Sequence, residues 1–204
     1  MIKESVGAVL CTVAMTATPL AQEPRLASPP GASATEVGGR YDEREGYVGG
    51  KWIEITFGRP IKRGRNLFGP ADYAEALNDG APVWRAGANV STRLRTEVPL
   101  LIGGMTLSPG EYTMFIDLQP QGWSLIISKW AAQTRFDENN KNALFGAYDY
   151  TPDRDVVRVP MTRETLSHSH DQLAWEFLDM TDGGGRLAIM WDKELASVPF
   201  GIVR

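Results

Sequence analysis

The sequence contains almost no cysteine and very little histidine. Among 204 residues there is one cysteine, Cys11, and there are two histidines, His168 and His170. Because Cys11 lies in an N-terminal segment that we interpret below as a leader, the mature chain is expected to contain neither a thiol nor a disulfide. These shortages exclude zinc–cysteine sites and thiol nucleophiles.

The sequence also lacks an excess of positive charge and any second long apolar run. The formal net charge is −4, with 21 Lys and Arg against 25 Asp and Glu. Nothing global therefore favours nucleic acid or anionic lipid as a partner. After the leader, no stretch approaches the ~20 apolar residues needed to span a bilayer, so we expect no stable membrane insertion of the mature chain.

The first 21 residues have the layout of a secretory signal peptide. Lys3 precedes the apolar run 6–15, and Thr18-Pro19-Leu20-Ala21 ends in a small residue before polar sequence. We predict cleavage after Ala21 and export to the periplasm or the extracellular space. Residues 22–34, rich in Pro, Ser and Ala, are predicted to be a flexible tether, which leaves 35–204 as one domain.

Turn-forming residues are abundant. The 21 Gly and 13 Pro separate short segments of alternating apolar and polar residues. Gly103-Gly104, between 100–102 and 105–107, predicts a tight hairpin. A first strand is expected near 34–37, residues 40–50 are expected to form an exposed loop, and helix has little room, at 71–77 or 130–142. The other predicted strands are 51–57, 111–118, 123–129, 156–161, 173–178, 186–191 and 197–203. The fold class is therefore mostly β, an antiparallel β-sandwich of jelly-roll-like arrangement with few short helices.

Several stretches, taken in order, resemble a bacterial family catalogued as domain of unknown function 2911. They are FGRP at 57–60, GRNLFG at 64–69, VWRAGAN at 83–89, LSPGEY at 107–112, WSLIISK at 123–129 and ASVPF at 196–200. The resemblance implies exported proteins with a β-rich domain, and it implies no particular activity. The chain departs from the family pattern at Ala86, at Val90, where an acidic residue often follows the Asn, and at 40–50, which looks inserted.

The best candidate site combines Arg59, Arg65, Trp84, Arg85 and Asn89. Guanidinium groups present rigid forks of donors to carboxylate or phosphate and can stack on an indole, which the Trp84-Arg85 pair suggests. The alternative is purely structural. In that case Asn89 holds a left-handed turn and the arginines tie loops to carbonyl groups.

Two further sets of residues are candidates for chemistry. Glu111 and Lys129 fall on strands expected to be neighbours, so they form either an acid–base pair beside the arginines or an ordinary surface ion pair. His168 and His170 in an extended strand would point to one side, near Asp171, but the sequence offers no distant third ligand and we assign no metal there. No cofactor is predicted.

Two functions remain open from the sequence. The favoured one is a non-enzymatic exported β-sandwich that binds a small polar or saccharide-like ligand, or a partner, through the arginine–tryptophan surface. The alternative is an exported hydrolase-like enzyme in which Arg85 and Asn89 position an anion and Glu111 or a histidine transfers the proton. The oligomeric state does not follow from the sequence.

Overall fold

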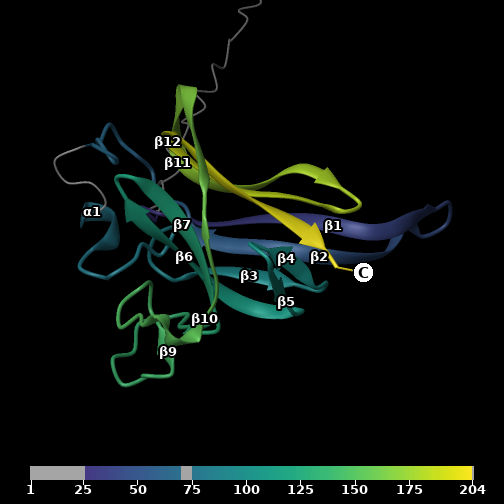
Figure 1. Ribbon diagram of the computed structural model, residues 1–204, viewed down its shortest axis with the longest axis horizontal. Helices are drawn as coiled ribbons and strands as arrows, with labels where there is room; N and C mark the ends of the chain where they lie inside the picture. The colour runs from purple at the N-terminus through teal and green to yellow at the C-terminus, as the bar shows by residue number, and fades with distance from the viewer. Residues whose placement is uncertain (1–25, 70–74, 204) are drawn as a thin grey trace, which may run out of the picture.

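The computed structural model describes residues 26–69 and 75–203 and consists mainly of two antiparallel sheets (Figure 1). The predicted signal peptide lies outside the described residues. The larger sheet has six strands, in the order β1 (Pro30–Asp42), β2 (Gly46–Gly58), β3 (Thr92–Thr96), β6 (Gly110–Gln119), β7 (Gly122–Ser128) and β10 (Asp155–Pro160). The smaller sheet has the order β11 (Thr162–Thr181), β12 (Gly184–Ile202), β4 (Leu100–Ile102) and β5 (Met105–Leu107).

Helix is scarce in the described ranges. It comprises one turn of α-helix, α1 (Glu75–Asn78), and a 3₁₀ turn, η1 (Pro152–Arg154). A short parallel pair, β8 (Ala131–Ala132) with β9 (Ala143–Leu144), lies in the long connection that follows β7. The mostly β, antiparallel fold class predicted from the sequence is confirmed.

The two sheets bury their facing sides against each other, as period-two alternation predicts. The same alternation places Ile53 and Ile55 of β2 inside together with Met114 and Ile116 of β6, and all four are fully buried. From the smaller sheet, Trp175 lies in the same core and is fully buried. Along one side the sheets approach closely enough for the Ser33 hydroxyl to donate to the carbonyl oxygen of Trp175.

Several local predictions are confirmed. β4 and β5 form the predicted hairpin, with Gly103 and Gly104 at φ of 58° and 81°. Both angles lie in the left-handed region that glycine adopts without steric cost, as a two-residue hairpin turn requires. β6 pairs with β7 from Thr113↔Ser128 to Gln119↔Gly122, again as predicted.

Two predictions at the N-terminal side need correction. β1 begins at Pro30, so the last five residues of the predicted tether, 30–34, are paired with β2. The segment 40–50, predicted to be a loop, is the end of the same hairpin, with Tyr41 opposite Tyr47. The composition of these segments suggests loop, but backbone pairing with an adjacent strand does not require large apolar side chains.

The smaller sheet also differs from the prediction in the length of its strands. Residues 162–181 and 184–202 form two continuous strands of 20 and 19 residues, where the sequence predicted shorter segments. Irregular register between 165 and 174 explains the difference, because these interruptions break the alternation without ending the pairing.

The segment 130–154 covers the outer side of the larger sheet and has a small apolar core of its own. Phe115 and Ile126 contribute from the sheet, and Trp130, Leu144 and Tyr150 contribute from the covering segment. Figure 1 shows this segment, in green, below the sheet and on the same side of the molecule as α1.

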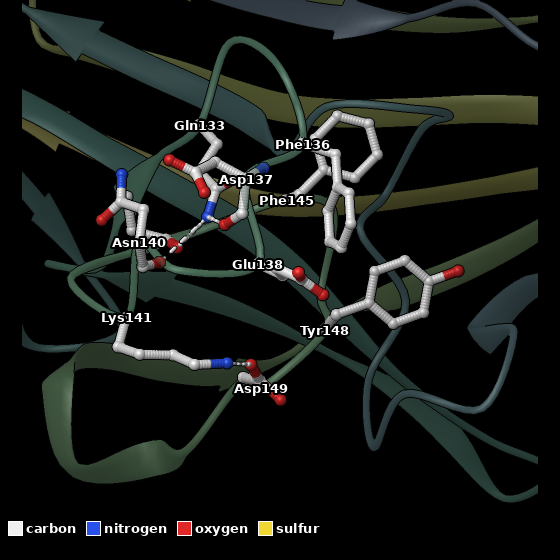
Figure 2. Close-up of a pocket in the computed structure, with 10 residues that line it drawn as sticks. Gln133, Phe136, Asp137, Glu138, Asn140, Lys141, Phe145, Tyr148 and Asp149 are labelled. Atoms are coloured by element: carbon white, nitrogen blue, oxygen red, sulfur yellow. Dashed lines mark hydrogen bonds and ion pairs between the residues drawn. The ribbon is translucent and has the colours of Figure 1, made fainter.

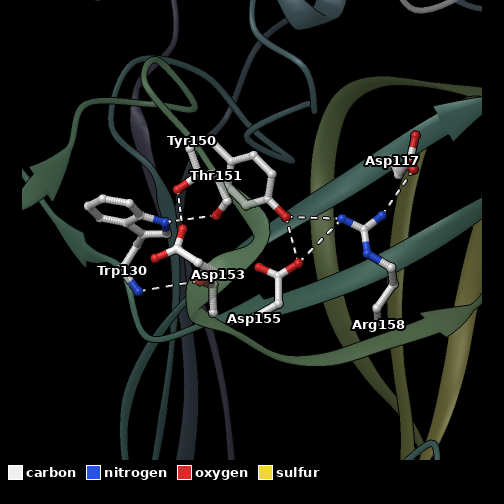
Figure 3. Close-up of polar contacts among 8 residues, drawn as sticks. Asp117, Trp130, Tyr150, Thr151, Asp153, Asp155 and Arg158 are labelled. Atoms are coloured by element: carbon white, nitrogen blue, oxygen red, sulfur yellow. Dashed lines mark hydrogen bonds and ion pairs between the residues drawn. The ribbon is translucent and has the colours of Figure 1, made fainter.

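Polar contacts fasten the end of the covering segment to β10. The Tyr150 hydroxyl donates to Oδ2 of Asp155 at 2.6 Å, and Arg158 contacts both groups and also Asp117, as Figure 3 shows. Burial, together with the carboxylate of Asp155, raises the pKa of Tyr150 well above that of a free tyrosine. Tyr150 therefore remains neutral at neutral pH and can donate this hydrogen bond.

Candidate functional site

Four of the residues predicted for the site line one cleft of about 340 Å³ beside α1. These are Arg65, Trp84, Arg85 and Asn89, and Asp79 adds a carboxylate that the sequence analysis did not single out. We call this hollow the arginine cleft. The rest of its lining is Ser28, Pro60, Ala76, Leu77, Gly87, Ala88 and Trp191.

The segment 83–89 supplies much of the cleft lining, and we call it the floor of the cleft. It is anchored to both sheets. Trp84 exchanges two backbone hydrogen bonds with Ile116 of β6, at 2.9 and 2.8 Å. The carbonyl oxygen of Ala86 accepts from the indole of Trp175 at 2.9 Å and from the hydroxyl of Thr92 at 3.1 Å. Ala86 itself has a φ of 52°, so these two donors hold a backbone conformation that is rare for alanine.

Trp84 and Arg85 point in opposite directions, so the predicted stacking between them does not occur. Consecutive side chains of an extended segment lie on opposite sides. Trp84 points inward, is 1% exposed and stacks on Trp191 with ring centroids 6.1 Å apart. The guanidinium of Arg85 lies instead over the ring of Tyr148, 5.1 Å from its centroid.

Arg85 is only 8% exposed, and its guanidinium is held by several contacts. One terminal nitrogen donates to the carbonyl oxygen of Asn89 at 3.2 Å, and the other contacts Oδ2 of Asp79 at 3.3 Å. The Tyr148 hydroxyl donates to the same Asp79 oxygen. This set of contacts satisfies Asp79 and fixes the orientation of the Arg85 guanidinium, so Arg85 has the loop-tying role foreseen in the structural alternative.

Arg65 is the exposed cation of the cleft. Its Nε and one terminal nitrogen donate to the carbonyl oxygens of Lys62 and Ile61 at 2.9 and 2.8 Å. Its guanidinium lies 5.7 Å from the centroid of the Trp191 ring. These contacts fix the fork in place, and within the described residues the remaining terminal nitrogen has no hydrogen-bond acceptor.

Asn89 has the left-handed conformation proposed in the structural alternative, with a φ of 63°. Its side-chain amide donates to the carbonyl oxygen of Ser28 at 3.3 Å and joins the start of the described chain to the rim of the cleft. Arg59 does not line the cleft. Its Nε donates to Leu173 of β11 at 3.3 Å, so its contact is with the smaller sheet.

The Glu111–Lys129 pair considered from the sequence is replaced by a different ion pair. Glu111 lies 3.7 Å from Arg93 of the neighbouring strand β3. Arg95 is directly opposite Glu111 in the ladder, so Arg93 occupies the diagonal position on the same face. Lys129 is exposed, and neither Glu111 nor Lys129 lines the arginine cleft.

The two histidines are neighbours, as the extended spacing predicted, with ring centroids 4.9 Å apart on β11. Across residues 26–69 and 75–203 there is no group of three or more His, Cys, Asp or Glu side chains arranged to hold a metal ion. In the same ranges, no helix has the length and apolar character to cross a membrane.

A salt-bridged group that the sequence analysis missed lies near the histidines. Lys62 contacts Asp192 at 2.7 Å, and the Ser169 hydroxyl donates to the same oxygen at 2.7 Å. Partial burial opposes ionisation of Asp192, but these hydrogen bonds hold the pKa of its carboxyl below the usual value. Lys62 and Ser169 are therefore both engaged by the Asp192 carboxylate.

Tyr148 connects the arginine cleft to a second, smaller hollow of about 70 Å³ in the covering segment. Figure 2 shows Tyr148 at the edge of this hollow, with its hydroxyl directed away from the Lys141–Asp149 ion pair. Gln133 organises the surrounding loop, since its side-chain nitrogen donates to three carbonyl oxygens, of Asp137, Asn140 and Ala143. These bonds hold together the loop 133–143, which precedes Tyr148 in the chain.

Comparison with known proteins identifies the family to which the chain belongs. A family profile described as "Protein of unknown function (DUF2911)" matches residues 41–200, most of the chain. The chain therefore belongs to the DUF2911 family, as its motifs predicted. No curated protein and no solved structure matches it significantly.

Proposed function

We propose that this DUF2911 protein is a non-enzymatic binding protein whose arginine cleft takes a small polar ligand bearing a carboxylate or phosphate, such as an acidic sugar. The observation that carries the proposal is the Arg65 guanidinium, held in a fixed orientation at one concave site, with a terminal nitrogen that has no hydrogen-bond acceptor among the described residues. A guanidinium N–H suits carboxylate and phosphate because the hydrogen bond that it donates to an anion is charge-assisted.

The charge balance of the cleft supports an anionic ligand. Arg85 is neutralised by Asp79, which also accepts from Tyr148. Arg65 has no carboxylate partner among the described residues, so the cleft retains one positive charge with an unused donor. An anion at this position would receive a charge-assisted hydrogen bond from a side chain that is already ordered, which lowers the entropic cost of binding.

The size and chemistry of the cleft favour a small polar molecule. Its volume of about 340 Å³ is near the lower end of the range typical of ligand pockets. Trp84 and Trp191 are almost fully buried and offer no open stacking platform, so recognition would rest on Arg65 and the Asn89 amide. These groups suit a ligand that carries hydroxyl groups beside its acid function.

Binding is favoured over hydrolysis because the groups considered for proton transfer lie elsewhere. Glu111 is on β6 and the histidines are on β11, and none of them lines the cleft. Asp79 is the carboxylate of the cleft, and it is already engaged by Arg85 and Tyr148. We further propose that the protein acts in the periplasm or outside the cell, on the basis of the leader-like composition of residues 1–21.

The proposal is tested by thermal shift with glucuronate, glucose and inorganic phosphate on the mature protein. Glucuronate or phosphate should raise the melting temperature and glucose should not, because only the first two offer an anion to Arg65. Arg65→Gln should abolish the rise. Arg63→Gln, an exposed arginine nearby that does not line the cleft, is the matched control and should leave the rise unchanged.

Three results would refute the proposal. They are the absence of any anion-dependent rise, an equal rise with glucose, and a rise that survives Arg65→Gln. Turnover of a glycoside or ester of the anion, lost in Arg65→Gln, would replace the binding function with the hydrolase alternative.

A further inference from the structure

The end of the β1–β2 hairpin extends past the smaller sheet. Figure 1 shows this hairpin, in purple and blue, projecting beyond the turn between β11 and β12. Tyr41 and Tyr47 form a cross-strand pair near its tip and are 71% and 61% exposed. Two large aromatic side chains are thus exposed side by side on a paired, ordered element.

A groove of about 490 Å³ lies between this hairpin and the edge of the main core. From the core side it is lined by Val98, Ile202 and Val203. The first two pack against the main core while remaining partly exposed. From the hairpin side it is lined by Val37 and Tyr47, and Tyr47 also lines an adjoining hollow of about 200 Å³. We call the larger hollow the hairpin groove.

Glycine keeps the hairpin groove open. Gly38, Gly39 and Gly49 all line it, with φ values of 68°, 77° and 77°. A Cβ atom added at Gly38 or Gly49 would meet nothing within 4 Å. Both the left-handed backbone and the missing side chains therefore leave room beside Tyr47 that ordinary strand residues would fill.

The charged side chains that line the groove indicate which kind of apolar ligand would bind there. Lys51 of β2 is the cation among the lining residues, and in the described chain it has no ion-pair partner. Asp182 also lines the groove, and it already takes part in an interaction of its own. An aliphatic body against Val98 and Ile202 with an anionic end at Lys51 would satisfy both features of the groove.

We propose that the hairpin groove is a second binding site, separate from the arginine cleft, that takes an aliphatic carboxylate. The chain of the ligand lies against Val98 and Ile202, Tyr47 covers it from the hairpin, and the carboxylate pairs with Lys51. The volume is that of a pocket for a small ligand, so the ligand is a single aliphatic acid of moderate length.

The probe for this site is decanoate, titrated into the mature protein by isothermal calorimetry below the concentration at which decanoate aggregates. Decanoate should bind, and Lys51→Met should weaken it about threefold to fivefold, the value of one partly exposed ion pair. Tyr47→Ser should weaken binding by removing the aromatic cover. Both side chains are exposed, so neither substitution should unfold the protein.

Matched controls separate the groove from general surface effects. Lys129→Met removes another exposed lysine, one that does not line the groove, and should leave decanoate affinity unchanged. Decyltrimethylammonium has the same chain with the opposite charge, and it should bind more weakly than decanoate to the wild type. Absence of decanoate binding, equal binding of the cationic probe, or equal affinity of wild type and Lys51→Met would overturn the proposal.

Discussion

The carbonyl oxygen of Ala86 gives a sharp test of how the floor of the arginine cleft is held. Two side chains donate to this buried oxygen, the Trp175 indole and the Thr92 hydroxyl. Removing one donor leaves the other, so the oxygen keeps a partner. Removing both leaves a buried acceptor without any hydrogen bond, and that loss is more costly than the loss of a single bond.

The expected free energies of unfolding follow from this arrangement. Thr92→Val should lower stability by about 1 kcal/mol, the net value of one hydrogen bond. Trp175→Phe removes a bond and buried volume, and should cost about 2 kcal/mol. The double variant should lose about 1–2 kcal/mol more than the sum, because only there is the acceptor orphaned.

The assay is urea unfolding followed by far-ultraviolet circular dichroism, for the wild type, both single variants and the double variant. Thr96→Val combined with Trp175→Phe is the control cycle. Thr96 is a buried threonine of the same strand whose hydroxyl bonds to Val98 instead. The control cycle should be additive, and additivity within about 0.5 kcal/mol in the Thr92–Trp175 cycle would refute the shared-acceptor argument.

Three further substitutions test other parts of the structure. Gly58→Ala should destabilise the fold by about 1–3 kcal/mol in urea unfolding, because its Cβ would lie 2.0 Å from the carbonyl oxygen of Ala88. The raised pKa of Tyr150 adds stability below pH ~10 that is lost as the pH rises further, so Tyr150→Phe should flatten the alkaline fall in melting temperature. The lowered pKa of Asp192 adds stability above pH ~4 that is lost on acidification, so Asp192→Asn should weaken the acid dependence of unfolding, and an unchanged pH profile in either variant would contradict its assignment.

The sequence predicts the strands in which apolar and polar residues alternate regularly. It does not predict strands whose backbone pairing occurs without such alternation. In 111–118 and 123–129, one side of each strand faces the core, so the apolar residues themselves report the strand. In 30–50, most side chains face solvent and glycine is frequent, so the composition imitates a loop although the backbone is paired. Register irregularities in β11 hide its length for a similar reason, since they shift the pattern from one face to the other.

The candidate site is predicted in part. The sequence motifs single out Arg65, Trp84, Arg85 and Asn89 as candidates. In the structure these four residues line one cleft. Asp79 escaped the sequence analysis because an Asp-Gly dipeptide indicates only a turn. Tyr148 escaped it because its contact with Arg85 joins residues 63 positions apart, a relation that no local pattern can contain.

Arg65 has an oriented guanidinium with one terminal nitrogen that has no acceptor among the described residues, and we expect an anion in the arginine cleft to bind there. The most direct measurement is nitrogen–proton NMR of the arginine side chains during titration with glucuronate at millimolar concentration. The side-chain resonances of Arg65 should shift in a saturable way, while those of Arg163, which is paired with Glu194 at 2.9 Å, should stay in place. Titration that leaves Arg65 unmoved, or that moves both arginines equally, would contradict the claim.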